Sequence, residues 1–284
     1  MKHLLKLMRP HHYIKNILIF AALACSGQLF QPEKLLAGGI GFVAFCLVAS
    51  AVYIINDIRD VEKDRLHPVK CSRPIASGAV PVKAARIQAA VLLLLAAALN
   101  GLVYHGASTL LLALYLALNV AYSFGLKDVP ILDVTILASG FLIRVLYGAY
   151  ITQIDVSSWL YLTVMVLAFY LSLGKRRNEL KRTDGATRKV LRAYPIQFLD
   201  RSMNMCMTLA LTFYALWSLD GNKNTAYGSY LVLTVPIALL IIMKYSLDIE
   251  GDSDGDPVEV LIHDKVLLGL CGIFFAAVFL ILYL

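Results

Sequence analysis

Residues 42–64 read FVAFCLVASAVYIINDIRDVEKD, an apolar run that ends in a cluster of acidic side chains. With the apolar residues upstream, the run is long enough for a membrane-spanning helix, which takes about 20 residues. At about 3.6 residues per turn, positions 57, 60 and 64 share one helical face, with position 56 beside position 60. The stretch therefore predicts a membrane helix with an oxygen-rich cluster at one end.

The acidic cluster has the composition of a magnesium site. Three carboxylates on one face repel each other unless a cation lies between them, and Mg²⁺ is bound in proteins through one or two carboxylates together with substrate phosphates. Ionisable groups at a membrane border are costly and tend to be functional. We predict that Mg²⁺ and a diphosphate are held by Asn56, Asp57, Asp60 and Asp64, with the three aspartates as catalytic residues. The alternative is a solvated helix end in which Asp64 pairs with a neighbouring basic residue.

The rest of the chain has the composition of a polytopic membrane protein. Of its 284 residues, 59% are hydrophobic and 16% are charged, and its mean hydropathy is +0.71. Soluble domains carry about 25% charged residues. We expect an all-α bundle of about nine transmembrane helices that forms a single domain over residues 1–284. The expected helices are 15–31, 35–58, 82–104, 107–125, 129–151, 157–174, 199–219, 228–247 and 264–284, of which the first and fourth are short enough to be partly re-entrant.

Basic residues alternate between successive loops. The N-terminus and the second and sixth loops carry most of the Lys and Arg, whereas the odd-numbered loops are nearly free of them. The positive-inside rule then places the N-terminus, the even loops and the acidic cluster in the cytosol. We expect a multi-pass protein of the inner (plasma) membrane. Because much of the net charge of +7 follows from this topology, no nucleic-acid partner is expected.

The eighth loop breaks this pattern. Residues 248–264 read DIEGDSDGDPVEVLIHD and are strongly acidic. A calcium-binding EF-hand register that begins at Asp248 would place Ser253 where that motif requires glycine. We therefore predict a solvated loop, with a lid over the active site as the alternative.

Basic side chains near the expected helix ends are candidates for binding substrate phosphates, because Lys and Arg bind phosphate directly and Arg does so through a bidentate fork. An Arg inside an apolar run is expensive, so we expect Arg144 to meet an anion or Asp133, either as a substrate site or as a structural ion pair. For Lys127, a purely topological role is the alternative. The predicted substrate-binding residues are Lys15, Asn16, Lys70, Arg73, Tyr122, Lys127, Arg144, Lys175 and Arg176.

One motif carries a family resemblance. Residues 56–78, NDIRDVEKDRLHPVKCSRPIASG, resemble the first aspartate-rich motif of the UbiA superfamily of intramembrane prenyltransferases. The resemblance extends over nearly the whole chain. It implies an all-α bundle with a central cavity open to the membrane, and Mg²⁺ bound to a diphosphate by the four motif residues.

The sequence departs from ordinary UbiA members at the cytosolic end of the sixth expected helix. Those members carry a second acidic motif there, whereas residues 174–180 of this chain read GKRRNEL and are predominantly basic. One acidic and one basic site indicate two phosphorylated substrates, a diphosphate on Mg²⁺ and a phosphate on Lys and Arg.

Three further segments narrow the resemblance. RPHHYIKN at residues 9–16, YSFGLK at 122–127 and GKRRNEL at 174–180 resemble the decaprenyl-phosphate phosphoribosyltransferase family. This implies transfer of 5-phosphoribosyl from phosphoribosyl diphosphate to a polyprenyl phosphate, with release of pyrophosphate, for cell-wall arabinan or another glycan. One alternative is a UbiA-type prenyltransferase with an aromatic acceptor, against which the missing second acidic motif argues. Another is an anionic-lipid transporter, which has no evident need for a four-ligand magnesium site.

Overall fold

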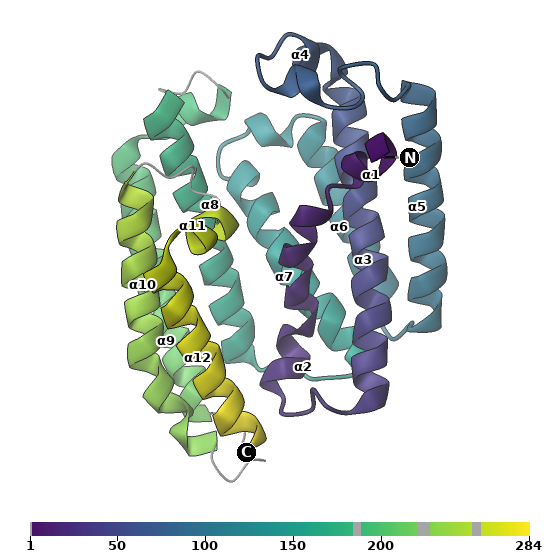
Figure 1. Cartoon of the computed structure of the whole chain (residues 1–284). Helices are drawn as coiled ribbons and strands as arrows, with labels where there is room; N and C mark the ends of the chain where they lie inside the picture. The colour runs from purple at the N-terminus through teal and green to yellow at the C-terminus, as the bar shows by residue number, and fades with distance from the viewer. Residues whose placement is uncertain (1, 184–188, 221–227, 252–256) are drawn as a thin grey trace. The chain divides into compact units, whose positions relative to one another are not determined.

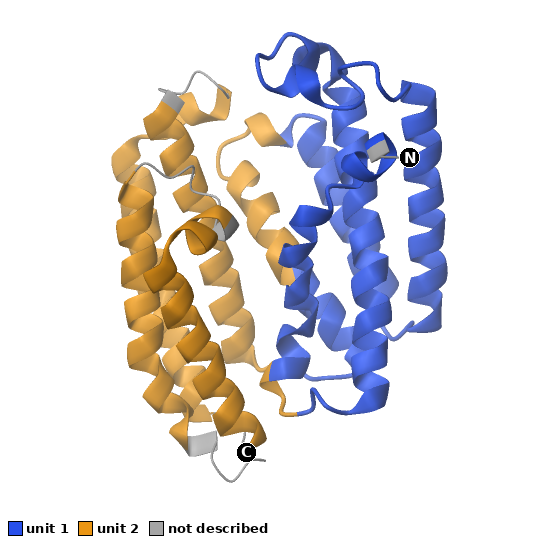
Figure 2. Cartoon of the chain, viewed as in Figure 1, with its two compact units in different colours: residues 1–24, 28–126, 143–155 blue, residues 25–27, 127–142, 156–284 orange. Residues whose placement is uncertain are grey.

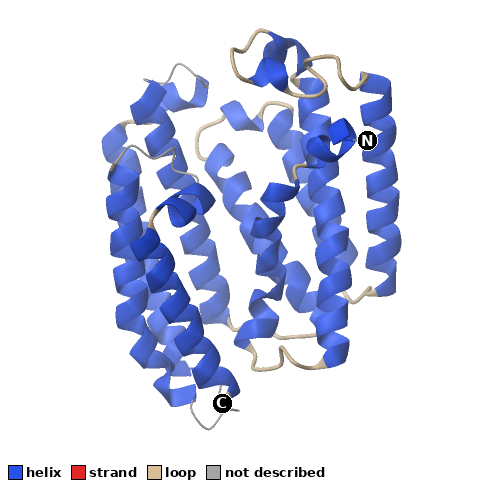
Figure 3. Cartoon of the chain, viewed as in Figure 1, coloured by secondary structure: helices blue, strands red, loops and turns tan. Residues whose placement is uncertain are grey.

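The computed structural model describes residues 2–183, 189–220, 228–251 and 257–284, and this part of the chain contains helices and no strands (Figures 1 and 3). The all-α prediction is therefore confirmed for these residues. The longer helices are α3 (Pro32–Arg59), α5 (Val82–Leu102), α6 (Ser108–Ser123), α7 (Leu132–Thr152), α8 (Ser158–Thr183), α9 (Ile196–Asp220), α10 (Val235–Glu250) and α12 (Lys265–Tyr283). The shorter elements are α1 (Lys2–Met8), η1 (Pro10–Phe20), α2 (Ala21–Cys25), α4 (Val61–Arg65), η2 (Lys70–Ser72), η3 (Leu126–Asp128), η4 (Lys189–Ala193), η5 (Gly228–Thr234) and α11 (Pro257–His263).

Among the described residues, six helices are long and apolar enough to cross a membrane. They are Pro32–Arg59, Val82–Leu102, Leu132–Thr152, Ser158–Arg182, Tyr230–Glu250 and Lys265–Tyr283. The apolar α6 has 16 residues, fewer than a perpendicular span needs. α9 has the length, but its first turns contain Asp200, Arg201 and Asn204. The expected count of nine spans therefore stays a prediction.

Two compact units divide the chain (Figure 2). Unit 1 contains residues 1–24, 28–126 and 143–155, and unit 2 contains residues 25–27, 127–142 and 156–284. Unit 1 is built around α3, which packs on α5 and α6. Its core is formed by tightly buried side chains that include Ile19, Phe45, Ala49, Tyr115 and Tyr147.

Unit 2 is built around the pair α8 and α9, with α10 and α12 packed on it. Its core includes Val134, Tyr170, Leu199, Tyr245 and Ile249. Many large apolar side chains of both units point outward instead, among them Leu94 on α5 and Phe275 on α12, which are 72% and 68% exposed. Such surfaces are expected where lipid tails, rather than water, surround a helix.

The first expected helix, 15–31, is wrong. The structure instead has the 3-10 segment η1 from Pro10 to Phe20, followed by the short α2, which ends at Cys25. Tertiary contacts explain the difference: the buried Asn16 donates to Cys46 Sγ over 3.1 Å and accepts from Arg144 over 2.7 Å. These bonds hold the segment in a conformation that local apolar content does not predict.

Two expected boundaries are also corrected. α8 continues to Thr183 rather than ending at position 174, because acidic partners within unit 2 allow its arginines to be buried. In the acidic segment 248–264, α10 extends to Glu250, and α11 spans Pro257–His263. Asp264 caps α12 by accepting from Leu267 N over 2.7 Å, and it binds Lys244 Nζ at 2.6 Å. Residues 252–256 of this segment lie outside the described part, and the rest is largely helical rather than a solvated loop.

Candidate active site

The acidic motif lies where α3 gives way to α4 in unit 1. α3 ends at Arg59, and Asp60 has backbone angles of φ −90° and ψ 8° before α4 begins. Hydrogen bonds of 2.9 Å from Asp60 N to Asn56 O and 2.8 Å from Asp64 N to Asp60 O keep helical spacing across this junction. The helical spacing predicted for positions 57, 60 and 64 is thus preserved through the motif, although the motif extends over two helices.

Two arginines bind the motif carboxylates. Arg73 Nη1 donates to Asp57 Oδ1 over 3.1 Å and to Asp64 Oδ2 over 2.7 Å. Arg9 Nη2 donates to the same Asp57 oxygen over 2.6 Å. The two carboxylates are almost completely buried, whereas the guanidinium groups are partly exposed. The result is a charge-balanced network in which both aspartates converge on one guanidinium nitrogen.

The position of Arg73 follows from the loop that carries it. Pro74, Ile75 and Ala76 are buried, and Ile75 and Val80 pack with Ile54 of α3 in one apolar cluster. A backbone bond of 2.9 Å from Val80 N to Pro74 O closes this turn. The apolar tail of the motif therefore anchors Arg73 beside the aspartates.

Arg9 is held in an unusual backbone conformation. It precedes η1 with φ 51° and ψ 60°, in the left-handed region that few residues other than glycine adopt. Its guanidinium also lies 5.0 Å from the ring centroid of Tyr53 on α3. Such backbone outliers cluster at functional sites, so Arg9 belongs with the acidic motif.

Asn56 completes the cluster from its other side. The Ser123 hydroxyl, at the end of α6, donates to Asn56 Oδ1 over 3.0 Å. Asp60 is half-buried beside it. The hydrogen bond from Ser123 links the acidic motif to the end of α6, which also carries Tyr122.

The donor set fits a magnesium ion shared with a phosphate ligand. Among the described residues, no group of three or more His, Cys, Asp or Glu side chains is arranged to hold a metal ion. However, Asp57 and Asp64 both reach one Arg73 nitrogen, so a single cation can reach both. Two carboxylates completed by substrate phosphates are a usual environment for Mg²⁺.

A second polar cluster lies inside unit 1, around Arg144 of α7. Its Nε donates to Asn16 Oδ1 over 2.7 Å, and its Nη2 donates to Tyr115 Oη over 3.1 Å. The guanidinium also lies over the rings of Phe45 and Tyr115. Asp133 is eleven positions away on the same helix, about 16 Å of helical rise, so the suggested direct pair with Asp133 is wrong.

The basic motif at the end of α8 is largely buried in unit 2. Arg176 Nε donates to Asp133 Oδ2 over 2.7 Å, and its Nη1 donates to Glu179 Oε2 over 2.5 Å. Arg177 Nε donates to Asp200 Oδ1 over 2.5 Å. Lys175 is only partly buried. Acidic partners from α7 and α9 therefore compensate the two arginines.

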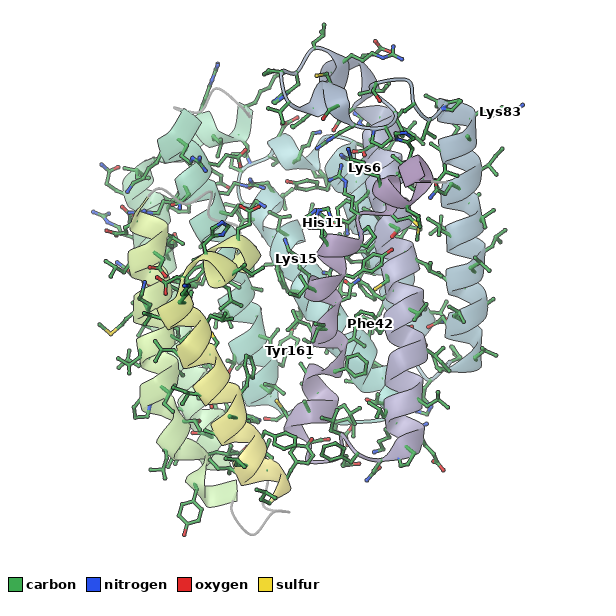
Figure 4. The ribbon with its side chains drawn as sticks, in the orientation of Figure 1. Lys6, His11, Lys15, Phe42, Lys83 and Tyr161 are labelled. Carbon is green, nitrogen blue, oxygen red and sulfur yellow. The ribbon has the colours of Figure 1, made fainter. Side chains whose placement is uncertain are left out.

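The remaining predicted residues are Lys15, Lys70, Tyr122 and Lys127. Lys15 comes from η1 and is half-buried (Figure 4). Tyr122 and Lys127 are also half-buried, and Lys70 is exposed in the loop that leads to Arg73. Substrate contact by these residues stays a prediction.

Sequence reasoning missed several side chains of these networks as site residues, among them Arg9, Ser123, Glu179 and Tyr194. Arg9, Ser123 and Glu179 belong to the motif segments 9–16, 122–127 and 174–180, so the sequence carried a usable signal for them. Tyr194 follows η4 and donates to Asp133 Oδ1 over 2.5 Å. Nothing in the local sequence pattern indicated that contact.

The fold and the site define a polytopic helical membrane protein with an acidic, arginine-bound motif at a helix end. The chain belongs to the UbiA prenyltransferase family, which it matches over residues 17–257.

Individual relatives agree with this membership. Decaprenyl-phosphate phosphoribosyltransferase of Corynebacterium glutamicum is 34% identical over 281 residues, which covers 95% of this chain and 84% of that protein. The protein of the same name from Mycobacterium tuberculosis is 35% identical over 269 residues, covering 92% and 88%. The structure of a UbiA homologue from Archaeoglobus fulgidus bound to GPP and Mg²⁺ has a TM-score of 0.75 at 18% identity and covers 99% of each chain. That likeness shows the shared fold.

Proposed function

We propose that this protein transfers 5-phosphoribosyl from phosphoribosyl diphosphate to a polyprenyl phosphate and releases pyrophosphate. The observation that carries the proposal is the 34–35% identity, over more than nine-tenths of the chain, to decaprenyl-phosphate phosphoribosyltransferases. The predominantly basic segment 174–180 supports it, because a second phosphorylated substrate needs cationic side chains rather than a second metal-binding motif.

In this proposal the acidic motif of unit 1 takes the diphosphate. Asn56, Asp57, Asp60 and Asp64 would hold Mg²⁺, which neutralises charge on the departing pyrophosphate. Asp57 and Asp64 are buried and close to each other, so they would supply the fixed anionic part of the site. The Archaeoglobus fulgidus homologue that was solved with Mg²⁺ supports the choice of metal.

Arg9 and Arg73 would bind the diphosphate oxygens beside this motif, with Lys70 assisting. A guanidinium can form paired hydrogen bonds to phosphate. Both arginines are partly exposed and so accessible to a ligand, and Mg²⁺ bound by Asp57 and Asp64 would take the place that Arg73 Nη1 holds between them. The arginines would fix the orientation of the ribose as the bond from C1 to the diphosphate breaks.

The acceptor phosphate would attack ribose C1 from the face opposite the leaving group, which inverts that carbon. A phosphate monoester is anionic at neutral pH, so no general base is needed, and catalysis would consist of positioning and electrostatics. Lys15, Lys127, Lys175 and Arg176 would divide between the lipid phosphate and the sugar 5-phosphate. Asn16, Tyr122 and Arg144 complete the proposed set of substrate-binding residues.

The membrane-length helices and the loop charges support the proposed location. We place the protein in the inner (plasma) membrane as a single domain, with its N-terminus and active site on the cytosolic side. The substrate phosphoribosyl diphosphate is soluble and the polyprenyl phosphate is a lipid, so a site at a cytosolic helix end can reach both.

The test is a transfer assay with purified protein in lipid nanodiscs. We expect label from phosphoribosyl diphosphate to enter the lipid fraction when decaprenyl phosphate is present, and pyrophosphate to appear in equal amount. A parallel reaction with geranyl diphosphate and 4-hydroxybenzoate should give no product. Prenylation of the aromatic acid without ribosyl transfer would overturn the proposal.

A further inference from the structure

A buried charge network joins three segments of unit 2. Asp133 is inaccessible at the start of α7, and its two oxygens accept from Arg176 Nε at 2.7 Å and from the Tyr194 hydroxyl at 2.5 Å. Arg176 also reaches Glu179, one turn further along α8, at 2.5 Å. Removing one partner of such a buried ion pair strongly destabilises a protein, because the remaining charge stays buried without its counter-charge.

The backbone beside this network is held in an uncommon conformation. Ile131 has φ 68°, a region that β-branched residues rarely adopt. Its N–H donates to the Tyr194 hydroxyl over 2.6 Å, so that hydroxyl accepts from Ile131 while it donates to Asp133. Burial and the Asp133 carboxylate raise the pKa of Tyr194, which keeps its proton on the hydroxyl. The surroundings must fix such a conformation, and it is found preferentially at functional sites.

Arg177, the neighbouring arginine, is also bound by carboxylates. Arg177 Nε binds Asp200 at 2.5 Å, and its Nη2 binds Glu250 at 3.3 Å. Both arginines of the basic motif are thus bound to carboxylates of unit 2, and both are nearly inaccessible. Lys175, the third consecutive cation, is only partly buried and projects about 100° around the helix from Arg176.

We propose that Asp133 and Tyr194 are positioning residues that hold Arg176 in place. Of the two residues of this motif assigned above to a substrate phosphate, Lys175 then makes the contact and Arg176 supports it. The network would fix the rotation of the last turns of α8, and with it the direction of Lys175. The inference rests on the proposed phosphoribosyl transfer, because it concerns one of the two phosphorylated substrates of that reaction.

The decisive experiment removes both charges of the pair at once. Asp133→Asn and Arg176→Gln each break the network, and each should raise the KM of one phosphorylated substrate by about tenfold or more, since the buried partner left behind loses a counter-charge. The double variant removes both members of the buried pair and leaves only Glu179, whose side chain is 19% exposed, so its KM should return to within about threefold of the wild type. If Arg176 itself binds the phosphate, the double variant will be as defective as Arg176→Gln, and the proposal fails.

Three further variants complete the test. Tyr194→Phe removes one hydroxyl and should raise the same KM less than Asp133→Asn does, with kcat preserved. Lys175→Gln should raise that KM and should not be rescued by any change at Asp133, whereas Lys175→Gln with an unchanged KM would overturn the proposal. Arg182→Gln, at an exposed position on the same helix, is the matched control and should behave as the wild type.

A substrate-free measurement separates this inference from the proposed function. The melting temperature should fall in both single variants and recover in the double variant, whatever reaction the protein catalyses. A wild-type protein without ribosyl transfer would contradict the proposed function alone. The positioning role alone would be contradicted by a different pair of results. The wild type would transfer phosphoribosyl, and the double variant would recover its melting temperature while its KM stayed high.

Discussion

At the residue scale, long-range partners decide the chemistry of the acidic motif. Asp57 is bound by Arg9, which lies 48 positions earlier, and by Arg73, which lies 16 positions later. Both cations are less buried than the carboxylates that they bind. Asp57, Asp64, Arg9 and Arg73 therefore form a network with equal positive and negative charge, and Asp60 adds a further carboxylate to the motif.

Removing one motif carboxylate should abolish most of the transfer. We expect Asp64→Asn to lower kcat/KM at least about a hundredfold, since even the partners of metal ligands contribute 10- to 100-fold. EDTA should stop the wild-type reaction, and added Mg²⁺ should restore it. Glu62→Gln is the control, because Glu62 is exposed and pairs with Arg65 at 3.1 Å. Full activity of Asp64→Asn would contradict the magnesium site.

Arg9 should act through substrate affinity. A hydrogen bond to a charged group contributes about 1.5–3 kcal/mol, and about 1.4 kcal/mol corresponds to a factor of ten. Arg9→Ala should therefore raise the KM for phosphoribosyl diphosphate roughly ten- to a hundredfold, and Arg9→Lys should recover only part because the fork is lost. An unchanged KM in steady-state kinetics would limit Arg9 to a structural role.

The sequence predicted the acidic residues of this site but not their partners. The spacing of Asp57, Asp60 and Asp64 at the end of an apolar run is local information, and hydrophobic periodicity reports it. The contact between Tyr194 and Asp133 depends on how helices pack, and neither side chain lies in a motif that was recognised. Arg176 was predicted to bind a phosphate from the basic composition of residues 174–180, and this stays a prediction. Its contact with Asp133 depends on helix packing, which the local sequence does not report.

At the element scale, apolar runs predicted the long helices well and the first one poorly. α3, α5 and α7 begin and end within a few residues of the expected ranges. The failure at residues 15–31 has a physical cause, because η1 lies so close to α7 that a side chain at Gly148 would collide with its backbone. Apolar content reports burial, but it does not report such close backbone contact.

Gly148→Ala tests this contact. Its added Cβ would lie 1.8 Å from the carbonyl oxygen of Ile19, and backbone cannot move aside as a side chain can. Overpacking costs about 1–3 kcal/mol, so we expect a clear fall in melting temperature in detergent. Gly101→Ala, on α5, is the matched control because nothing lies within 4 Å of its added Cβ. Equal melting temperatures of the two variants would contradict the close approach of η1 and α7.

At the scale of the whole molecule, composition predicted a helical membrane protein, and both the family and the fold agree. Composition alone could not predict the exact number of membrane-spanning helices, because α6 is short and α9 carries charged residues in its first turns. The orientation rests on loop charge alone. This orientation decides whether the acidic motif can bind soluble substrates from the cytosol. It can be measured by labelling a cysteine that the chain already contains.

Cys71 is the exposed cysteine of the motif loop, whereas Cys46 and Cys206 are buried and Cys25 and Cys271 are partly buried. If this loop is cytosolic, a membrane-impermeant maleimide should label Cys71 only after the cells are permeabilised, and Cys71→Ser should remove that signal. In the Cys71→Ser background, His105→Cys should be labelled on intact cells, because His105 is exposed between α5 and α6 in a loop expected outside. Since the positive-inside rule assigns sides by loop charge, the two positions must respond oppositely. Labelling of Cys71 on intact cells would place the acidic motif outside, away from cytosolic phosphoribosyl diphosphate.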